Sequence, residues 1–458
     1  MNPLKQIMNI RRDELPQALL MFCYFFLVIT TFSVLKPLKS GLFIQFYDQS
    51  GFDLMGWHML AAQAELLAKV LNMVIALVAA TVFALLSRSF RRQQLTYVFS
   101  VFILSCFLFF TFVLDSPGAP TIWSFYLFGD LYSTLMVATF FAFLNDSVEP
   151  EAAKRLYGLI VLGGVAGGFF GATFAAVRVD DLSMVQWLWI FMGLAVAIVV
   201  IAGLAGKMFA RKSLLQEPEP EEKPISAGSP LTEAARMVFR SRYLLSIVAI
   251  VGLYEMVSTT MDFQFKSTIA YYLDGPAISV HIATVQAISN GISFFIQIFL
   301  TSLVMRRFGV GTALLVLPVM ALAGSVGFLF TPVLLTGSAL YIFDNGFNNS
   351  INQSSKEVLY VPTTRVEKYQ AKAFIDMFVQ RLAKAVAVGL SLAITTLFVG
   401  FGSVRWLSLV TALILVAWIS IVRFAGKEFE KISGEPPDSS NRKNPSSPDH
   451  KRGGFTEK

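Results

Sequence analysis

Long apolar segments separated by short polar ones dominate this sequence. A helix needs about 20 mainly apolar residues to cross the hydrocarbon core of a bilayer, and segments of that length recur in both halves of the chain. They lack the strict alternation of apolar and polar positions that barrel strands show, so they predict helices. The pattern predicts an all-α membrane protein with twelve transmembrane helices, at about residues 15–35, 64–86, 95–114, 122–145, 156–177, 185–205, 243–263, 281–304, 312–331, 334–355, 371–399 and 404–424.

The composition supports this class of protein. Hydrophobic residues make up 55% of the 458 residues and charged residues only 15%, which is too little polar surface for a water-soluble chain of this size. Cys23 and Cys106 lie in predicted helices, so neither a disulfide framework nor a metal site is expected. The first apolar segment is long and lacks a small-residue cleavage site, which argues against a cleavable signal peptide.

A polar segment divides the chain into two sets of six predicted helices. Residues 216–224 are rich in glutamate and proline and predict a flexible tether. The two sets also echo each other, since Phe90-Arg91-Arg92 follows the second helix and Arg306-Arg307-Phe308 follows the eighth. Two related six-helix bundles are the plan of major-facilitator-type transporters, whose substrate binds near the bilayer midplane between them. The expected domains are a cytoplasmic N-terminus at 1–14, bundles at 15–205 and 243–424, a cytoplasmic linker at 206–242 and a disordered cytoplasmic tail at 425–458.

Lysine and arginine are distributed unevenly among the loops. Most of the 37 basic residues lie in the termini, the central polar segment and alternate loops, which the positive-inside rule assigns to the cytoplasm. Both termini are therefore expected to be cytoplasmic. This bias accounts for the net charge of +7, so no nucleic-acid partner is expected.

Asparagines recur on one face of the tenth predicted helix. Asn345, Asn348, Asn349 and Asn352 lie at helical spacing, and Lys356 continues the row. Such amides either line a cavity and bind a polar ligand, or join helices by hydrogen bonds within the bilayer. Five polar groups in register favour a cavity wall.

The eleventh predicted helix carries Lys372, Asp376, Gln380 and Lys384 at steps of four, with Arg381 beside them. A charge at bilayer depth costs about 2.5–3.5 kcal/mol even on a lenient scale, so such residues usually face a cavity or one another. Arginine offers a planar fork and lysine a point charge, and both suit phosphate oxygens. The alternative is an internal ion pair such as Asp376 with Arg381, and Lys372 is expected at the cytoplasmic rim.

The first predicted helix ends in Lys36 and Lys39, which share a face. Pro37 lies between them and is expected to kink or end the helix. The two lysines either bind substrate or extend to the lipid–water interface, as long basic side chains near helix ends do. Lysine is otherwise scarce in the loops predicted on the outer side, which favours a substrate role.

Acidic and basic residues share a face on two further helices. On the seventh, Glu255 and Asp262 are seven residues apart and Lys266 follows four later, while Glu65 and Lys69 on the second are four apart. Such pairs form either a gate that opens when an anionic substrate competes for the cation, or static pairs that make burial tolerable.

Two more acids, Asp130 and Asp344, occupy corresponding places in the two halves. An ionisable residue within a membrane span is a candidate proton or cation carrier, and a structural role remains equally open for each.

Glycines at 163–171 recur at four-residue spacing in an apolar helix and lack the spacing of a phosphate-binding loop. They predict close helix packing. The three histidines are scattered and no nucleophile motif is present, so no catalytic centre, metal site or cofactor is expected.

Three passages resemble the ATP/ADP translocase (nucleotide transporter) family of bacteria and plastids, which has a major-facilitator-like architecture. They are Lys356–Pro362 with its continuation through Lys368–Asp376 and Arg381–Lys384, then Leu253–Glu255 through Asp262–Lys266, and Arg155–Gly158 leading into the glycine-rich helix. The resemblance spans most of residues 15–425 and implies exchange of nucleotides, with ATP for ADP as the typical pair.

The resemblance also implies site residues. Basic residues of the first and eleventh helices are those expected to hold phosphates, which here are Lys36, Lys39, Arg381 and Lys384. Members from energy parasites tend to have acidic residues near the end of the first helix, where this chain has Pro37 and Ser40. That departure bears on ATP/ADP specificity.

The leading hypothesis is a monomeric antiporter of a bacterial inner membrane that exchanges nucleotides or related phosphorylated anions by alternating access. Tyr126, Tyr254 and Phe347 are candidates to stack on a base. The alternatives are a proton-coupled exporter of drugs or organic solutes, and a non-transporting membrane scaffold or sensor. The candidate substrate residues are Lys36, Lys39, Glu255, Asp262, Lys266, Asn345, Asn348, Asn349, Asn352, Asp376, Arg381 and Lys384, and the candidate gating or ion-coupling residues are Asp130, Asp344, Glu65 and Lys69.

Overall fold

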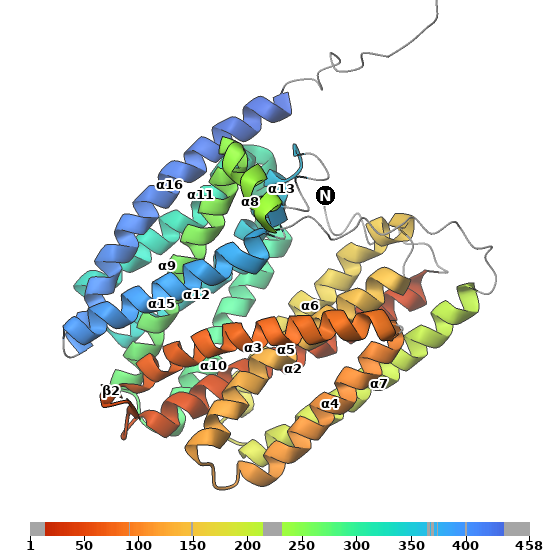
Figure 1. The fold of residues 1–458 in the computed structure, drawn as a ribbon, viewed down its shortest axis with the longest axis horizontal. Helices are drawn as coiled ribbons and strands as arrows, with labels where there is room; N and C mark the ends of the chain where they lie inside the picture. Colours follow the sequence, from red (N-terminus) through yellow and green to blue (C-terminus); the bar gives the residue numbers. More distant parts are fainter. Residues whose placement is uncertain are drawn as a thin grey trace, which may run out of the picture.

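Two groups of long helices, one from each half of the chain, make up the computed structural model (Figure 1). It describes residues 14–90, 92–147, 150–213, 231–363, 367, 371–372, 374–398 and 401–434, without the side chains of some residues in these ranges, including Asp376. The first group consists of α2 (Leu15–Tyr47), α3 (Ala61–Ser89), α4 (Arg92–Val113), α5 (Ala119–Ser147), α6 (Pro150–Arg178) and α7 (Met184–Ser213), with a short hairpin, β1 (Phe52–Leu54) and β2 (Trp57–Met59), between α2 and α3.

The second group begins after the central segment. It consists of α8 (Leu231–Arg240), α9 (Arg242–Tyr272), α10 (Pro276–Phe295), η1 (Ile296–Leu300), α11 (Thr301–Phe330), α12 (Leu334–Phe347), η2 (Asn348–Asn352), α13 (Gln353–Leu359), η3 (Ile375–Val379), α15 (Gln380–Leu397), η4 (Phe401–Ser403) and α16 (Val404–Gly434). The groups meet where α10 packs against α2 and α6, and where α3 packs against α9 and α15.

Each group has its own apolar core. In the first, aromatic rings interlock, with Phe140 stacked on Phe25 at 4.4 Å and edge-on to Tyr24 at 5.0 Å between ring centres. In the second, Trp418 and Tyr254 are buried in a separate cluster. The first core also takes in Phe265 and Ile278 of the second group, so the two groups are packed together over part of their length.

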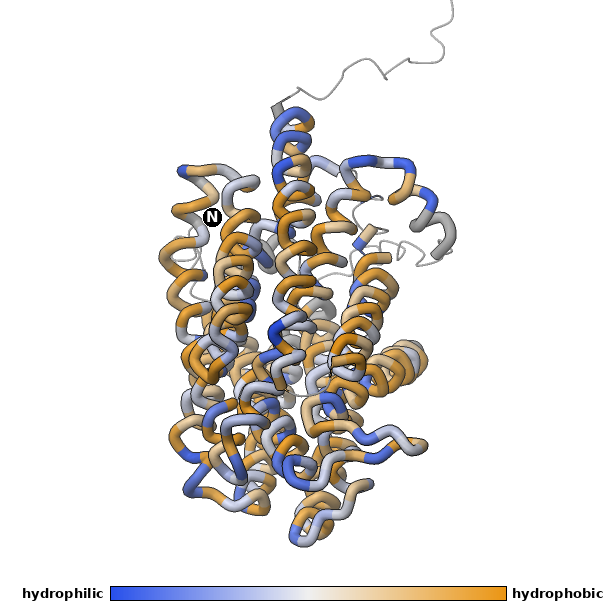
Figure 2. Tube along the Cα trace, turned by 90° about the vertical axis from the view of Figure 1, so that its left-hand side faces the viewer, coloured by the Kyte–Doolittle hydropathy of each residue, from blue (hydrophilic) through white to orange (hydrophobic). Residues whose placement is uncertain are grey.

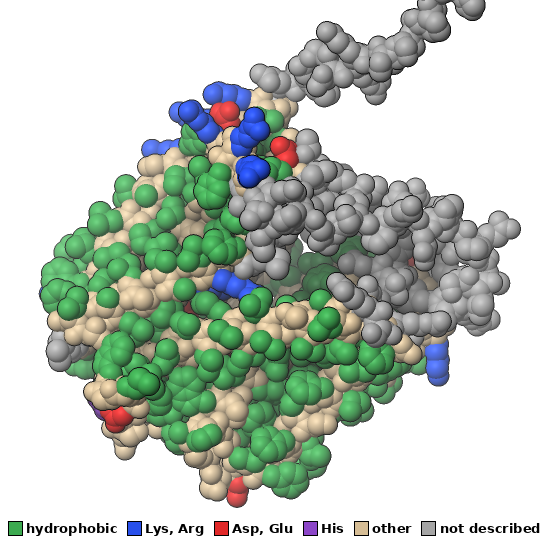
Figure 3. Space-filling model, in the orientation of Figure 1, with side chains coloured by type: hydrophobic (Ala, Val, Ile, Leu, Met, Phe, Trp, Pro, Cys, Tyr) green, Lys and Arg blue, Asp and Glu red, His purple; other side chains and the backbone are tan. Residues whose placement is uncertain are grey.

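The outer surface of both groups is apolar, as a surrounding of lipid requires. Ten of the described helices are long and apolar enough to cross a membrane. Large apolar side chains such as Leu77, Phe112 and Leu413 are exposed. Hydrophobic side chains cover most of the face in Figure 3, and the helices in Figure 2 are mostly hydrophobic along their length, with hydrophilic residues concentrated at their ends.

The glycine-rich helix packs as its spacing predicts. A Cβ atom at Gly163 would lie 2.6 Å from the carbonyl oxygen of Phe22, and one at Gly171 would lie 2.6 Å from that of Thr30. Gly167 between them faces the carbonyl of Phe26 in the same way. These glycines let α6 approach the backbone of α2, so the prediction of close helix packing is confirmed.

Several boundaries differ from those read in the sequence. Helix α2 continues through Pro37 to Tyr47, whereas the sequence suggested an end or kink at the proline. Part of the predicted linker is helical, because α8 is amphipathic and buries Val238 in the second core. Helix α16 extends to Gly434, and residues 214–230 and 435–458 lie outside the described residues.

Three π-helical turns interrupt the helices of the second group. They are η1 after α10, η2 between α12 and α13, and η3 before α15. A π turn inserts one residue into the helical register, and such turns are frequent at functional sites. The tenth and eleventh predicted helices are therefore not regular spans, and each carries a π turn among its polar residues.

Candidate functional site

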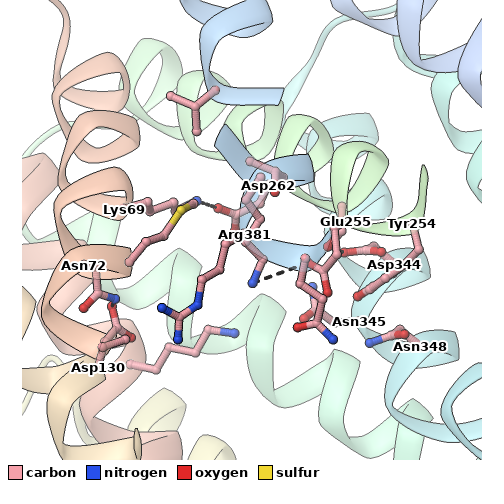
Figure 4. A pocket seen from close by; sticks show the side chains of 18 of the residues that line it. Lys69, Asn72, Asp130, Tyr254, Glu255, Asp262, Asp344, Asn345, Asn348 and Arg381 are labelled. Carbon is pink, nitrogen blue, oxygen red and sulfur yellow. Dashed lines mark hydrogen bonds and ion pairs between the residues drawn. The ribbon is translucent and has the colours of Figure 1, made fainter. Parts of the chain in front are cut away.

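A polar cavity of about 570 Å³ lies between the two groups of helices (Figure 4). Helices α2, α3 and α5 form one side of it, and α9, α12, α13 and α15 form the other. Its lining consists of Lys36, Lys39, Ser40, Lys69, Asn72, Met73, Ala76, Tyr126, Asp130, Tyr254, Glu255, Ser258, Thr259, Asp262, Lys266, Asp344, Asn345, Asn348, Gln353, Lys356, Gln380, Arg381, Lys384 and Val388.

Cations outnumber carboxylates in this lining. Seven lysine or arginine side chains line the cavity, against four carboxylates. All eleven charged residues lie on helices, and uncompensated charge within a membrane is expensive. The cavity therefore favours a ligand with several negative charges.

Lys39 is held inside the first group. Its side chain is 3% exposed and forms an ion pair with Asp130 of α5. Its Nζ also donates to the carbonyl oxygen of Tyr126 at 3.4 Å and lies 4.4 Å from the centre of the Tyr126 ring. This burial contradicts an interfacial position for Lys39. Asn72 of α3 donates to the same Asp130 carboxylate.

Lys36 reaches across to the second group. Its Nζ donates to the hydroxyl of Tyr341 on α12 at 3.1 Å and lies 5.5 Å from the centre of that ring. The two lysines that the sequence paired on one face of α2 thus have partners in different halves of the chain.

An ion-pair network joins α3 to α9 at the wall of the cavity. Lys266 lies 2.6 Å from Glu65 and 3.1 Å from Asp262, and Lys69 pairs with Asp262. The Glu65 carboxylate, 1% exposed, also accepts hydrogen bonds from Ser40 at 2.9 Å and Tyr126 at 3.1 Å. Each half therefore neutralises charges of the other.

This network departs from the spacing in the sequence. The predicted pair of Asp262 with Lys266 forms, but Glu65 and Lys69 on α3 form no ion pair with each other among the described residues. Both bind residues of α9 instead. Glu65 stands just behind the cavity lining, whereas Lys69 is part of it.

Basic residues of α15 complete the cationic side. Lys384 lies 3.3 Å from Glu255 of α9 and remains 42% exposed. Arg381 projects into the cavity between the two groups (Figure 4), and no ion pair of Arg381 occurs among the described residues. The side chain of Asp376, its candidate partner in the sequence, lies outside the described residues. Lys372 pairs with Glu357 at 2.7 Å, away from the cavity lining.

The asparagine row is divided by the π turn η2. Asn345 and Asn348 line the cavity. Asn349 lies instead in a neighbouring smaller cavity, and Asn352 is fully buried, with its Nδ2 donating to Asn348 Oδ1 at 2.9 Å. Gln353 and Lys356, which follow the π turn, line the first cavity again. The predicted face is therefore interrupted at Asn349 and Asn352 and resumes after them.

Asp344 differs from the other acids. It is 2% exposed and accepts a hydrogen bond from Ser258 Oγ at 2.6 Å. Unlike Asp130, Glu255 and Asp262, it has no cationic partner among the described residues.

Sequence reasoning missed several polar lining residues. Asn72 is one helical turn beyond Lys69, and Ser258 lies between Glu255 and Asp262, so both share faces already marked by charges. Gln353, directly after the π turn, was also missed. Lys356, which continues the asparagine row in the sequence, does line the cavity. The signal for Asn72 and Ser258 was present in their spacing, but a neutral side chain in an apolar helix stands out less than a charged one.

The lining of the cavity is suited to binding an anion. No cluster of histidine, cysteine, aspartate or glutamate that can hold a metal ion occurs among the described residues. Ammonium and guanidinium groups spread over both halves of the chain can surround phosphate oxygens in place of water. Helices that pack as two groups about such a cavity form a fold of the major-facilitator type.

Solved structures support this fold. The chain is similar to the nucleoside transporter NupG (D323A mutant), with a TM-score of 0.58 at 13% identity, over 91% of this chain and 99% of that one. A bacterial homolog of the human lysosomal transporter Spinster, in an inward-facing and unoccupied conformation, gives a TM-score of 0.56 at 13% identity, over 93% and 99%. FucP, a major facilitator superfamily transporter in the outward conformation, gives 0.53 at 15% identity, over 89% and 99%.

Sequence comparisons identify the family. ADP,ATP carrier protein 1 of Chlamydia pneumoniae is 25% identical over 346 residues, which cover 68% of this chain and 67% of that protein. ADP,ATP carrier protein 1 of Rickettsia prowazekii (strain Madrid E) is 20% identical over 493 aligned positions, which cover 94% and 95%. The plastidic ATP/ADP-transporter of Solanum tuberosum is 23% identical, over 69% of this chain and 55% of that one.

The profile of the TLC ATP/ADP transporter family matches residues 119–429. The chain belongs to that family, and the resemblance stated from the sequence is confirmed.

Proposed function

We propose that this protein exchanges nucleotides, ATP against ADP or closely related phosphorylated anions, across a bacterial cell membrane by alternating access. The observation that carries the proposal is the cavity between the two groups of helices, in which seven cationic side chains face four carboxylates. Family membership and the carrier names of the relatives support the choice of nucleotide. Such transport breaks no covalent bond, so the protein is not expected to be an enzyme.

The architecture proposed for this function has twelve spans in two bundles, at residues 15–205 and 243–424. Ten spans are the long apolar helices, and the other two are α12–η2–α13 and the helix that contains η3 and α15. Their polar residues lower their hydropathy and π turns interrupt their α-helices, as is expected for spans that line a cavity. We propose a monomer with both termini in the cytoplasm and no nucleic-acid partner, on the distribution of basic residues.

The roles of the residues follow from their partners. Arg381 has no ion pair among the described residues and is the cation most available to a phosphate. Lys39, Lys69 and Lys266 are paired with carboxylates in the structure. A polyphosphate can displace those carboxylates because its oxygens offer the same charge-assisted hydrogen bonds.

The pairs between α3 and α9 are proposed to close one side of the cavity. With the termini in the cytoplasm, Lys356 lies toward the cytoplasmic end of α13, and Glu65, Asp262 and Lys266 lie farther toward the outer side. A cavity that reaches Lys356 but ends at this network supports a state that is open to the cytoplasm. Opening to the outside then requires the Glu65–Lys266 and Lys69–Asp262 pairs to separate.

Liposomes reconstituted with the purified protein test this function. Labelled ATP should accumulate in liposomes loaded with ADP and not in empty ones, because exchange needs a counter-substrate. Uptake of an organic solute under a proton gradient, without nucleotide exchange, would support the proton-coupled exporter. Absence of flux for every solute would support a scaffold or sensor.

The exporter is kept as a second candidate because of Asp344. Its buried carboxyl group accepts a hydrogen bond from Ser258 and has no ion pair among the described residues. An ionisable residue in that position within a membrane span is a candidate proton carrier. Nucleotide exchange that does not change with an imposed proton gradient would leave Asp344 a structural role.

A further inference from the structure

A second cavity, of about 340 Å³, adjoins the first. It lies between α2 and α6 of the first group and α10, α12 and η2 of the second. Lys36 and Asn345 line both cavities, so the two spaces share a wall. Its volume falls within the range of about 300–1,000 Å³ that small-molecule sites occupy.

The two cavities differ in chemistry. The second is walled by apolar side chains, including Phe25, Ile29 and Phe32 of α2, and by α6 at Gly164 and Gly168. Its polar groups are mainly amides, namely Gln286, Asn290, Asn345 and Asn349. Among the described residues Lys36 is the one charged group in its lining, and no carboxylate is present.

Gln286 shows an unused acceptor at this site. The side chain is 3% exposed, and its Nε2 donates to the carbonyl oxygen of Ser33 at 2.8 Å. Its Oε1 is buried and has no hydrogen-bond partner among the described residues. Leaving a buried acceptor unpaired is costly, so an N–H donor supplied by a ligand would be stabilising there.

Asn290 offers a second acceptor one helical turn farther along α10. Its Nδ2 donates to the carbonyl oxygen of Gly168 at 2.9 Å, and its amide oxygen has no hydrogen bond among the described residues. The missing side chain at Gly168 keeps this space open, since a Cβ there would lie 3.6–3.9 Å from Ile29, Ser33 and Asn290.

We propose that the second cavity binds the adenine base of the nucleotide while the first binds its phosphates. This inference rests on the proposed function and adds to it the place where the base is recognised. A nucleotide has its base and its phosphates at opposite ends of a ribose, which matches an amide-lined apolar cavity joined to a cationic one. Lys36 stands at the junction, beside the ribose and first phosphate.

The lining residues suit adenine in particular. Asparagine and glutamine amides pair with the exocyclic amine and ring nitrogens of adenine, whereas carboxylates pair with the exocyclic amine of cytosine. The exocyclic amine of adenine would donate to Gln286 Oε1. Aromatic and aliphatic side chains of α2 would contact the face of the adenine ring. Aromatic side chains of proteins that bind single-stranded nucleic acids stack on bases in the same way.

The aromatic residues of the first cavity are less available for stacking. Lys39 Nζ lies 4.4 Å over the Tyr126 ring, and Lys356 Nζ lies 4.8 Å over the Tyr254 ring. Phe347 packs against two apolar clusters. The three rings proposed from the sequence for base stacking thus already have partners.

Binding of two ligands to purified protein separates base recognition from phosphate recognition. ATP carries the base, and inorganic tripolyphosphate carries only the phosphate chain. The variant Gln286→Leu removes the free acceptor at similar volume. It should weaken ATP binding about tenfold and leave tripolyphosphate affinity unchanged, since the lost hydrogen bond belongs to the base.

Gln264→Leu is the matched control. Gln264 is also buried, donates from Nε2 to the carbonyl of Val404 at 3.1 Å and has an unpaired Oε1, but it lines neither cavity. The ratio of ATP affinity to tripolyphosphate affinity should stay at the wild-type value in this variant.

A second variant keeps the proposal testable if Gln286→Leu does not fold. Gly168→Ala places a methyl group in the second cavity at ordinary contact distance from its neighbours. It should weaken ATP binding about fivefold or more and spare tripolyphosphate, because space for the base is lost. Gly193→Ala is its control, since a Cβ at Gly193 of α7 has nothing within 4 Å.

The possible results separate the proposed base site from the proposed nucleotide exchange on which it rests. Wild-type protein that binds neither ATP nor tripolyphosphate would contradict both. Wild-type protein that binds the two equally, or variants that lose both ligands equally or neither, would overturn the base site and leave a phosphate site standing. A specific loss of ATP affinity in Gln286→Leu or Gly168→Ala, with both controls unchanged, supports it. If the methyl group of Gly168→Ala displaced a bound lipid and left ATP affinity unchanged, the second cavity would be a lipid site and the base site would be disproved.

Discussion

The side chain of Lys39 passes directly over Gly129 on its way to Asp130. A Cβ atom at position 129 would lie 2.5 Å from Lys39 Cδ, closer than real Cβ contacts. The missing side chain of Gly129 thus provides the space in which a buried lysine of α2 reaches a carboxylate of α5. The position of Lys39, a candidate to bind phosphate, therefore depends on Gly129, the neighbour of its partner Asp130.

Gly129→Ala should therefore weaken transport although it removes no charge. The added methyl group displaces Lys39 from Asp130, and a hydrogen bond to a charged group contributes about 1.5–3 kcal/mol. We expect the KM for ATP uptake into ADP-loaded liposomes to rise about tenfold. Gly193→Ala, where a Cβ meets nothing within 4 Å, serves as the control. Equal KM values for the two variants would show that Lys39 can adjust without loss.

Lys39→Ala and Arg381→Ala should each abolish ATP uptake while the protein still reaches the membrane. The first change removes the charge beside Asp130, and the second removes a cavity cation that has no ion pair among the described residues. Uptake by liposomes with matched protein content measures the effect.

Lys372→Ala is the control for these two charge deletions. Lys372 pairs with Glu357 at 2.7 Å, both side chains are more than one third exposed, and the residue lies outside the cavity lining. An exposed pair contributes little, so uptake should stay near the wild-type value. Normal uptake in both Lys39→Ala and Arg381→Ala would disprove the phosphate-binding assignment.

The sequence predicted the membrane helices and most of the cavity residues for one physical reason. A charged group in an apolar span is so costly that it marks a cavity or a partner wherever it occurs. Lys36, Lys39 and Asp262 were identified in this way, and the structure brings them together in one lining. Apolar segment length predicted the helices by the same energetic argument.

The sequence could not predict which charged residues of different helices form ion pairs with each other. Helical spacing compares residues within a segment, so it paired Glu65 with Lys69, whereas the structure pairs Glu65 with Lys266, which is 201 positions away. Helical spacing likewise did not show that Asn349 lines a second cavity while Asn345, Asn348 and Lys356 line the first. Neutral residues such as Asn72 and Gln286 were identified as cavity-lining only in the structure.

The Glu65–Lys266 pair should show strong coupling in a double-mutant cycle. Both side chains are nearly inaccessible, with 1% and 8% exposure, so removing one leaves the other buried and uncompensated. Glu65→Leu or Lys266→Met alone should lower the free energy of unfolding by about 3–5 kcal/mol, and the double variant by less than the sum. Thermal unfolding of the purified proteins measures this. Additive effects would indicate that Ser40 and Tyr126, which also donate to Glu65, already compensate its charge.

Packing of α6 on α2 should depend on Gly167. Its missing side chain faces the carbonyl of Phe26, and its own carbonyl accepts a hydrogen bond from Thr30 Oγ1 at 3.2 Å, so the two backbones are in contact. Gly167→Val forces the helices apart, and overpacking of a tight contact costs about 1–3 kcal/mol.

We expect the thermal unfolding temperature of Gly167→Val to fall by several degrees relative to Gly193→Val, which carries the same substitution on α7 where a Cβ meets nothing within 4 Å. The change in intrinsic helix propensity is similar in both variants, because valine replaces glycine within a helix in each case. The difference between them therefore reports the contact between α6 and α2. Equal unfolding temperatures would show that the two helices can separate by the width of a side chain without loss of stability.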